Sequence, residues 1–227
     1  MIEYLFLDLD DTILDFKKAE YVAASKTFAS FGIVPTEEVL KRYHVINDLH
    51  WKMLERGELT REQVVVRRFG VLFGELGVDA DPAECALRYM ENLSIGHYFL
   101  SGAEEAVARL SKKYRLYIAT NGTASVQERR MTSANLYRFF ERVFISQELG
   151  VNKPAAEFFE RSFAQIPGFD KAKAMIVGDS LTSDIRGGIN AGIATCWVNP
   201  THKPAGEIIP DHEIESLTQL EALLESL

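Results

Sequence analysis

The chain has 227 residues, enough for one large domain or for a core domain with an insertion. It carries 25 Lys+Arg against 33 Asp+Glu, a formal net charge of −8, and this acidic balance argues against a nucleic-acid-binding surface. Hydrophobic residues make up 47% and charged residues 26%, values typical of a globular chain and not of a disordered one.

The two cysteines, Cys85 and Cys196, are far apart and lack the spacing of a disulfide framework or a structural zinc site. The first residues lack the basic and apolar regions of a signal peptide, and no apolar run approaches the ~20 residues of a membrane span. We therefore expect a cytoplasmic protein with no membrane partner.

Five short apolar runs predict buried strands. They are Tyr4–Leu7, Leu116–Ala119, Val143–Ile145, Ala174–Val177 and Thr195–Val198. Continuous rather than alternating hydrophobicity is typical of strands covered on both faces, as in a parallel sheet. The polar residues that follow each run would then gather at the carboxyl edge of the sheet, where open α/β folds bind ligands.

The segment 16–94 interrupts this pattern, because it contains helical periodicity and no clear strand. Two helical faces are expected to end at Gly32 and Gly57, a Thr60/Gln63 capping box opens a third helix, and Pro82 opens a fourth. We therefore predict an α/β, Rossmann-like parallel-sheet core made of residues 1–15 and 95–227, with a four-helix insertion at residues 16–94.

Helices are also expected between the core strands. A capping box at Ser101–Glu104 predicts one helix start, and Pro154 is placed in the first turn of another. The segment from Asp184 to Asn190 predicts a short helix that ends at Gly192.

The segment Asp8–Thr12 carries the strongest chemical signal. Asp8 and Asp10 follow the first strand at positions i and i+2, a spacing that aims both side chains the same way while the chain stays extended. Two neighbouring carboxylates repel each other, so a divalent cation, a shared proton or both must offset the repulsion. A hard cation such as Mg²⁺ suits such oxygen ligands and a phosphate substrate. The alternative is an aspartate-rich turn.

Three further groups follow later strands. Thr120, Asn121 and Gly122 offer a hydroxyl and backbone amides to an oxyanion, Lys153 precedes a predicted helix, and Asp179 is followed five residues later by Asp184. Taken singly, these groups are better explained as a turn, a surface lysine and a helix cap. Their order along the chain is what favours a shared site.

The four groups together resemble the motifs of the haloacid dehalogenase superfamily, in the form DxDxT, a strand-ending Thr, a Lys and GDxxxxD. The resemblance implies that Asp8 is the nucleophile and Asp10 the general acid and base. It implies that Thr120, Asn121, Gly122 and Lys153 bind phosphate. A Mg²⁺ site would comprise Asp8, Asp10 through its backbone carbonyl, Asp179 and Asp184, with Asp184 orienting Lys153 or a metal-bound water.

The acid at position 10 favours a phosphatase over a dehalogenase, because a halide leaves without a proton. Residues 16–94 resemble the C1 helical cap of the superfamily, which implies a small-molecule phosphate ester rather than a phosphoprotein as substrate. Longer strings, including Ala119–Gly122 with Gln127 downstream, resemble the bacterial pyrimidine 5′-nucleotidase (noncanonical nucleotide phosphatase) subfamily. That resemblance implies a nucleoside 5′-monophosphate substrate.

Several alternatives stay open. Phosphoglycolate, a sugar phosphate or another small metabolite could be the substrate instead of a nucleotide. A non-catalytic phosphate-binding protein is a further hypothesis. In the cap, Trp51, Arg67 and Arg68 are candidates for substrate recognition. Packing in the helical core is the simpler explanation of Trp51, and the two adjacent arginines cannot both point inward. The sequence leaves open whether the protein is a monomer or a dimer.

Overall fold

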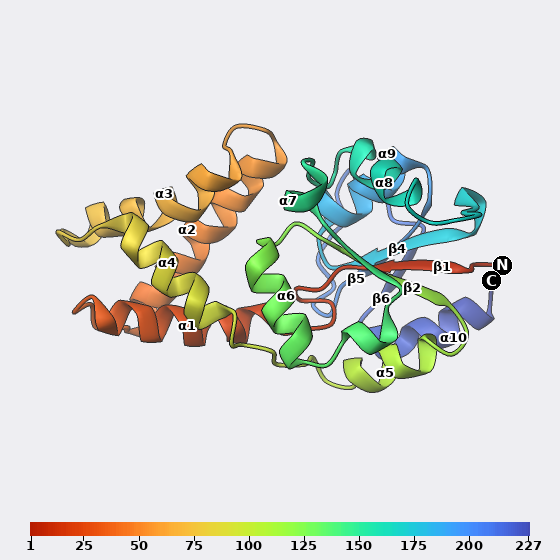
Figure 1. Cartoon of the computed structure of the whole chain (residues 1–227), viewed down its shortest axis with the longest axis horizontal. Helices are drawn as coiled ribbons and strands as arrows, with labels where there is room; N and C mark the ends of the chain where they lie inside the picture. The colour runs from red at the N-terminus through yellow and green to blue at the C-terminus, as the bar shows by residue number, and fades with distance from the viewer. The chain divides into compact units, whose positions relative to one another are not determined.

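The computed structural model describes all 227 residues and divides the chain into two compact units. One unit consists of Met1–Phe16 and His97–Leu227, and the other of Lys17–Gly96. The first is an α/β core and the second is a bundle of helices (Figure 1). No helix in the chain combines the length and the apolar character needed to cross a bilayer.

The core is built on a six-stranded parallel sheet of order β3-β2-β1-β4-β5-β6. The strands are β1 (Tyr4–Leu7), β2 (Arg115–Thr120), β3 (Arg142–Ile145), β4 (Ala174–Gly178), β5 (Ala194–Val198) and β6 (His212–Ile214). The five predicted strands are confirmed. The sixth was missed because β6 is a three-residue edge strand in which only Ile214 is buried, so it has no apolar run.

Helices cover both faces of the sheet (Figure 1). They are α5 (Ala103–Leu110), α6 (Ala124–Ser133), α7 (Ser146–Leu149), α8 (Ala156–Phe163), α9 (Arg186–Ala191) and α10 (Leu220–Glu225). Leu5 and Leu7 of β1 face the cluster that includes α5, α6 and α10, whereas Tyr4 and Phe6 face the aromatic cluster of α8 and α9. This two-sided burial explains why β1 is apolar throughout.

Two predicted starts of core helices were wrong, and a third helix is present but begins later than predicted. Helix α5 begins after Gly102, whose φ of 70° makes it a left-handed cap, and no side chain caps the helix, so the Ser101 capping box does not form. Pro154 lies before α8 instead of in its first turn, since Ala155 is the N-cap. The segment after Ser180 forms a π-helical turn, η3 (Leu181–Ile185), before α9, which ends at Gly192 as predicted.

The second unit contains α1 (Phe16–Ser30), α2 (Glu37–Glu55), α3 (Arg61–Leu76) and α4 (Pro82–Leu93). The Thr60/Gln63 capping box is confirmed by both reciprocal hydrogen bonds, and Pro82 is the first residue of its helix. Four rings, those of Phe28, Tyr43, Phe69 and Tyr89, form the centre of the unit, with Tyr43 stacked on Phe69 at 5.3 Å. The helices are therefore held by an aromatic core of their own.

Candidate active site

The predicted polar residues lie at the carboxyl ends of three adjacent strands. Asp8 follows β1, Thr120 ends β2 and Asp179 follows β4, and β2, β1 and β4 are neighbours in the sheet. Because all the strands are parallel, these three ends share one edge of the sheet. Residues more than 100 positions apart in sequence are thus brought to one place by strand order.

Lys153 lies at the centre of this edge, and its side chain is only 1% exposed. Its Nζ donates to Asp8 Oδ1 at 2.7 Å, to Asp184 Oδ1 at 2.6 Å and to the carbonyl oxygen of Ala119 at 2.5 Å. All three donor positions of the ammonium are therefore used. The lysine is held in place by both carboxylates and by strand β2.

The charges of this group do not cancel, since one ammonium faces two buried carboxylates. Burial raises the pKa of Asp8 from 3.8 to about 7; Lys153 opposes the rise, and the neighbouring Asp184 and Asp10 add to it. Burial by itself would lower the pKa of Lys153, but attraction to Asp184 and Asp8 outweighs it, and the pKa of the lysine is raised. The group therefore holds one excess negative charge at Asp8 when that carboxyl is ionised.

Asp179 adds a third carboxylate to the same place. One carboxylate oxygen from each of Asp8, Asp179 and Asp184 lies within 4.8 Å of the others. The backbone carbonyl of Asp179 accepts a hydrogen bond from Trp197 Nε1 at 2.8 Å, which ties the residue to β5. An all-oxygen set with excess negative charge has the chemistry of a Mg²⁺ site.

Asp184 is the most constrained of these acids. Besides receiving Lys153 on Oδ1, it accepts the backbone N–H of Ser180 on Oδ2 at 3.0 Å. Gly178 makes room for it, because a methyl group there would lie 2.7 Å from Asp184 Cβ. The carboxylate thus connects the lysine to the loop after β4.

Asp10 is separate from the three-carboxylate cluster. Its Oδ2 accepts from Gln127 Nε2 at 2.8 Å, and its Oδ1 pairs with Arg130 Nη1. Gln127 and Arg130 are buried on α6, with exposed fractions of 1% and 0%. The turn that carries Asp10 continues through Asp11, which has a left-handed φ of 54° and accepts the backbone N–H of Phe16.

Arg130 was missed at the sequence level, and Gln127 was noted only as part of a string. A signal was present: Gln127 and Arg130 are one turn apart and share a helix face with the apolar Met131 and Val126, which is an unusual place for polar side chains. What such a pair contacts depends on where α6 packs, and one sequence does not determine that.

The three predicted phosphate-binding residues at the end of β2, Thr120, Asn121 and Gly122, differ in their contacts. Thr120 Oγ1 accepts hydrogen bonds from Gly122 N at 3.1 Å and from Gln127 Nε2 at 2.9 Å. The Asn121 side chain exchanges a pair of hydrogen bonds with the backbone of Lys153, both at 2.9 Å. Asn121 therefore holds the lysine loop against β2.

The three recognition candidates of the helical unit lie in different environments. Arg67 is exposed, Trp51 is half-buried, and Arg68 is 3% exposed. Arg68 Nη1 donates to Asn47 Oδ1 at 2.5 Å, and its guanidinium lies 4.8 Å from the ring centre of Tyr89. An internal structural role therefore accounts for Arg68, and one arginine of the pair points outward as expected.

Trp51 is oriented by two contacts. Its Nε1 donates to Asn47 Oδ1 at 3.0 Å, and the guanidinium of Arg61 lies 5.5 Å from the centre of its ring. It also packs against the small apolar cluster of Leu54, Leu59 and Val64. Packing within the bundle is thus part of its role, and recognition stays a prediction for Trp51 and Arg67.

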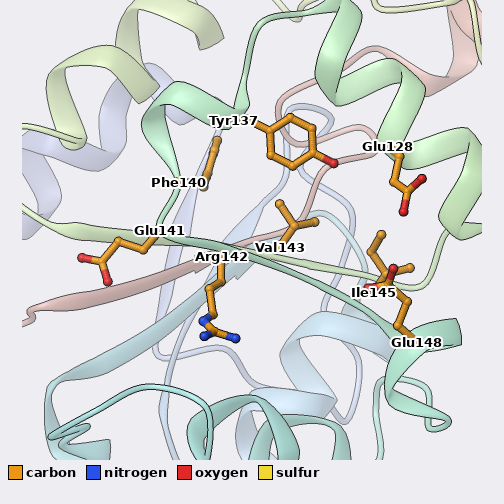
Figure 2. Close-up of a pocket in the computed structure, with 8 residues that line it drawn as sticks. All are labelled: Glu128, Tyr137, Phe140, Glu141, Arg142, Val143, Ile145 and Glu148. Carbon is orange, nitrogen blue, oxygen red and sulfur yellow. The ribbon is translucent and has the colours of Figure 1, made fainter.

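A hollow of about 280 Å³ lies elsewhere on the core, beside the edge strand β3 (Figure 2). Residues of α6, β3 and α7 line it, among them Glu128, Arg142 and Glu148. It shares no residue with the group around Lys153. The candidate active site is therefore defined by side-chain geometry at the carboxyl edge and not by this hollow.

Comparison with known proteins agrees with this geometry. The sequence profile of the family described as Haloacid dehalogenase-like hydrolase matches residues 4–198. HAD-hydrolase YfnB of Bacillus subtilis is 41% identical over 221 residues, which cover 97% of this chain and 94% of YfnB. Its crystal structure, bound to magnesium, matches with a TM-score of 0.94 over 99% of both chains at 39% identity.

Two further relatives have named activities. Pyrimidine 5′-nucleotidase PynA of Streptococcus pneumoniae is 38% identical over 96% of this chain and 93% of its own length. Pyrimidine 5′-nucleotidase YjjG of Escherichia coli is 30% identical over 98% of this chain and 97% of its own length. With a profile match over most of its length and these full-length relatives, the chain belongs to the haloacid dehalogenase-like hydrolase family.

Proposed function

We propose that this chain is a Mg²⁺-dependent phosphomonoesterase that hydrolyses small phosphate esters, foremost pyrimidine nucleoside 5′-monophosphates, through an aspartyl-phosphate at Asp8. The observation that carries the proposal is Lys153 held between Asp8 and Asp184 beside Asp179. Such a group holds an anionic nucleophile and neutralises charge, which is most of what phosphoryl transfer requires.

In the first half-reaction, an Asp8 carboxylate oxygen attacks phosphorus and the bond from phosphorus to the ester oxygen breaks. Asp10 gives its proton to the departing alkoxide, which leaves as the alcohol. Lys153 offsets the charge on Asp8, and Thr120 donates to a phosphoryl oxygen. In the second half-reaction water attacks phosphorus, Asp10 takes a proton from that water, and the bond from phosphorus to the Asp8 oxygen breaks, which gives inorganic phosphate and free Asp8.

Asp8, Asp179, Asp184 and the backbone carbonyl of Asp10 are the groups that would hold Mg²⁺. The oxygen-only donors and the excess negative charge of the carboxylate cluster fit this ion. When bound, Mg²⁺ would supply positive charge beside the nucleophile and the phosphoryl oxygens. The relative YfnB crystallised with bound magnesium, which supports Mg²⁺ as the ion.

The contacts of Asp10 favour a phosphatase over a dehalogenase. A halide leaves as a stable anion, so a positioned acid would have no task, whereas an alkoxide needs a proton. The pyrimidine preference is supported by the two full-length relatives named pyrimidine 5′-nucleotidases. Trp51 and Arg67 remain our candidates for recognition of the substrate in the helical unit.

The test is a panel of about fifty phosphate esters assayed with and without Mg²⁺, ranked by kcat/KM. We expect Mg²⁺-dependent hydrolysis with pyrimidine nucleoside monophosphates ranked above purine nucleotides, sugar phosphates and phosphoglycolate. Asp8→Asn should abolish turnover, and an acid-quenched wild-type reaction should give an Asp8 peptide heavier by one phosphoryl group. A different top-ranked substrate would overturn the pyrimidine assignment, and absence of any hydrolysis would favour a phosphate-binding protein.

A further inference from the structure

Helix α6 contributes two buried polar side chains to the candidate site that none of the four sequence motifs contains. Gln127 Nε2 donates both to Asp10 Oδ2 at 2.8 Å and to Thr120 Oγ1 at 2.9 Å. Arg130 Nη1 donates to Gln127 Oε1 at 3.0 Å and also pairs with Asp10 Oδ1. The Gln127 amide therefore links Asp10, the proposed proton donor, to Thr120, which is proposed to bind the phosphoryl group.

The orientation of the Gln127 amide is determined by its partners. A guanidinium can only donate, so the atom of Gln127 that faces Arg130 must be the oxygen. The nitrogen is then the atom that faces Asp10 and Thr120, and its two hydrogens are directed at the Asp10 carboxyl group and the Thr120 hydroxyl.

The hydroxyl of Thr120 is oriented as a consequence. Its oxygen accepts from Gln127 Nε2 and from Gly122 N, and a hydroxyl oxygen has two lone pairs and one hydrogen. Because both lone pairs are engaged, the Thr120 hydroxyl cannot accept another hydrogen bond and can only donate one. A group that can only donate suits a phosphoryl oxygen, which can only accept.

The side chains of Gln127 and Arg130 are closely packed. A methyl group on Gly122 would lie 2.6 Å from Gln127 Cγ, well inside van der Waals contact, so glycine at this position leaves room for the amide. Arg130 has no exposed surface, and its guanidinium lies 5.9 Å from the ring centre of Phe16. The pair is therefore packed in place instead of moving freely on the surface of α6.

We propose that Gln127 and Arg130 are positioning residues for phosphoryl transfer: together they hold the Asp10 carboxylate and direct the Thr120 hydroxyl toward the phosphoryl group. This inference rests on the proposed phosphatase function. Neither residue touches the reacting atoms, so each acts through Asp10 or Thr120. Holding a proton-transfer group within a fraction of an ångström accounts for about 100-fold in rate.

The first test compares leaving groups, using Gln127→Met and Arg130→Lys, with Arg129→Lys on the exposed face of α6 as the control. Substrates are p-nitrophenyl phosphate, whose phenolate leaves without a proton, and a nucleoside 5′-monophosphate, whose alkoxide needs one. We expect kcat/KM of the nucleotide to fall about 100-fold and that of p-nitrophenyl phosphate about 10-fold or less. The parameter kcat/KM covers the steps up to alcohol release, where Asp10 is the acid.

A second test measures the contribution of Thr120 to phosphate affinity without turnover. Inorganic phosphate is titrated calorimetrically in the presence of Mg²⁺. Gln127→Met and the isosteric Thr120→Val should each weaken phosphate binding about tenfold, since a hydrogen bond to a charged group is lost. The double variant should be no weaker than either single variant, because both changes disrupt the same hydrogen bond from Thr120 to phosphate. Circular dichroism and urea midpoints establish that each variant is folded.

The outcomes separate the two proposals. Equal losses on both substrates, or additive losses of phosphate affinity, would overturn the positioning role. A wild-type protein that hydrolyses no ester, but whose phosphate affinity depends on Gln127 through Thr120, would overturn the phosphatase and retain the orientation of Thr120. Active enzyme with an unaffected Gln127→Met variant would overturn the inference and leave the phosphatase standing.

Discussion

The excess negative charge at Asp8 predicts that the candidate nucleophile destabilises the metal-free protein at neutral pH. The pKa of Asp8 is raised from 3.8 to about 7, first by burial, with Asp184 and Asp10 adding to the rise. Between these values the folded protein keeps a proton that the unfolded chain has lost. The stabilising contribution is therefore complete below pH 3.8 and is lost as the pH rises through about 7.

The size of the destabilisation follows from the change in the pKa of Asp8. One pKa unit corresponds to about 1.4 kcal/mol, so the rise from 3.8 to about 7 corresponds to about 4 kcal/mol of the free energy of unfolding. An asparagine carries no charge at any of these pH values and resembles the protonated carboxyl. Asp8→Asn should therefore be more stable than wild type at pH 8, by up to about 4 kcal/mol, while it loses turnover.

The measurement is urea unfolding at intervals from pH 5 to pH 8 in EDTA, so that no metal ion stabilises the carboxylate. A Trp51→Phe background leaves Trp197 as the single tryptophan, which reports on the core unit. The exposed Asp48→Asn is the control, and it should shift stability by no more than about 0.5 kcal/mol. The reasoning is refuted if Asp8→Asn follows the wild-type pH profile or is less stable at pH 8.

Three further substitutions test other contacts. Lys153→Met should abolish hydrolysis and cost about 3–5 kcal/mol in urea unfolding, because it leaves two buried carboxylates unpaired; wild-type stability would contradict the buried ion-pair cluster. Arg68→Met should cost about 2–4 kcal/mol through its lost bond to Asn47 and its ring contacts, while an equally destabilising Arg67→Met would show that burial does not distinguish the two arginines. Gly122→Ala should displace the Gln127 side chain and lower kcat/KM for a nucleotide about tenfold or more, and unchanged kinetics would argue against that crowding.

Much of the architecture could be predicted because its signals are local. The five predicted strands contain continuous apolar runs, since a parallel sheet is covered on both faces, and the Thr60/Gln63 and Pro82 helix starts depend on adjacent residues alone. Errors occurred where the local signal is ambiguous. The Ser101 capping box does not form, because Gly102 adopts a left-handed conformation and is itself the N-cap. Pro154 lies outside its helix, and the short strand ending in Ile214 has no apolar run.

The candidate site divides in the same way. Asp8, Thr120 and Asp179 could be anticipated, because each directly follows or ends a buried strand and parallel strands bring such positions to one edge. The contacts of Gln127 and Arg130 could not be anticipated. They depend on how α6 packs against the turn after β1, which lies more than 100 residues away in the chain.

Local sequence signals were enough to predict the fold class and the chemical types of residue at the carboxyl edge of the sheet. The sharing of charge among them became visible only in the folded chain, where Lys153 binds both Asp8 and Asp184, and Asp10 is bound by Gln127 and Arg130 of α6. The physical reason is that strand and helix signals extend over a few adjacent residues. Pairing between charged side chains depends instead on distances of a few ångströms between distant segments, which exist only once the chain has packed.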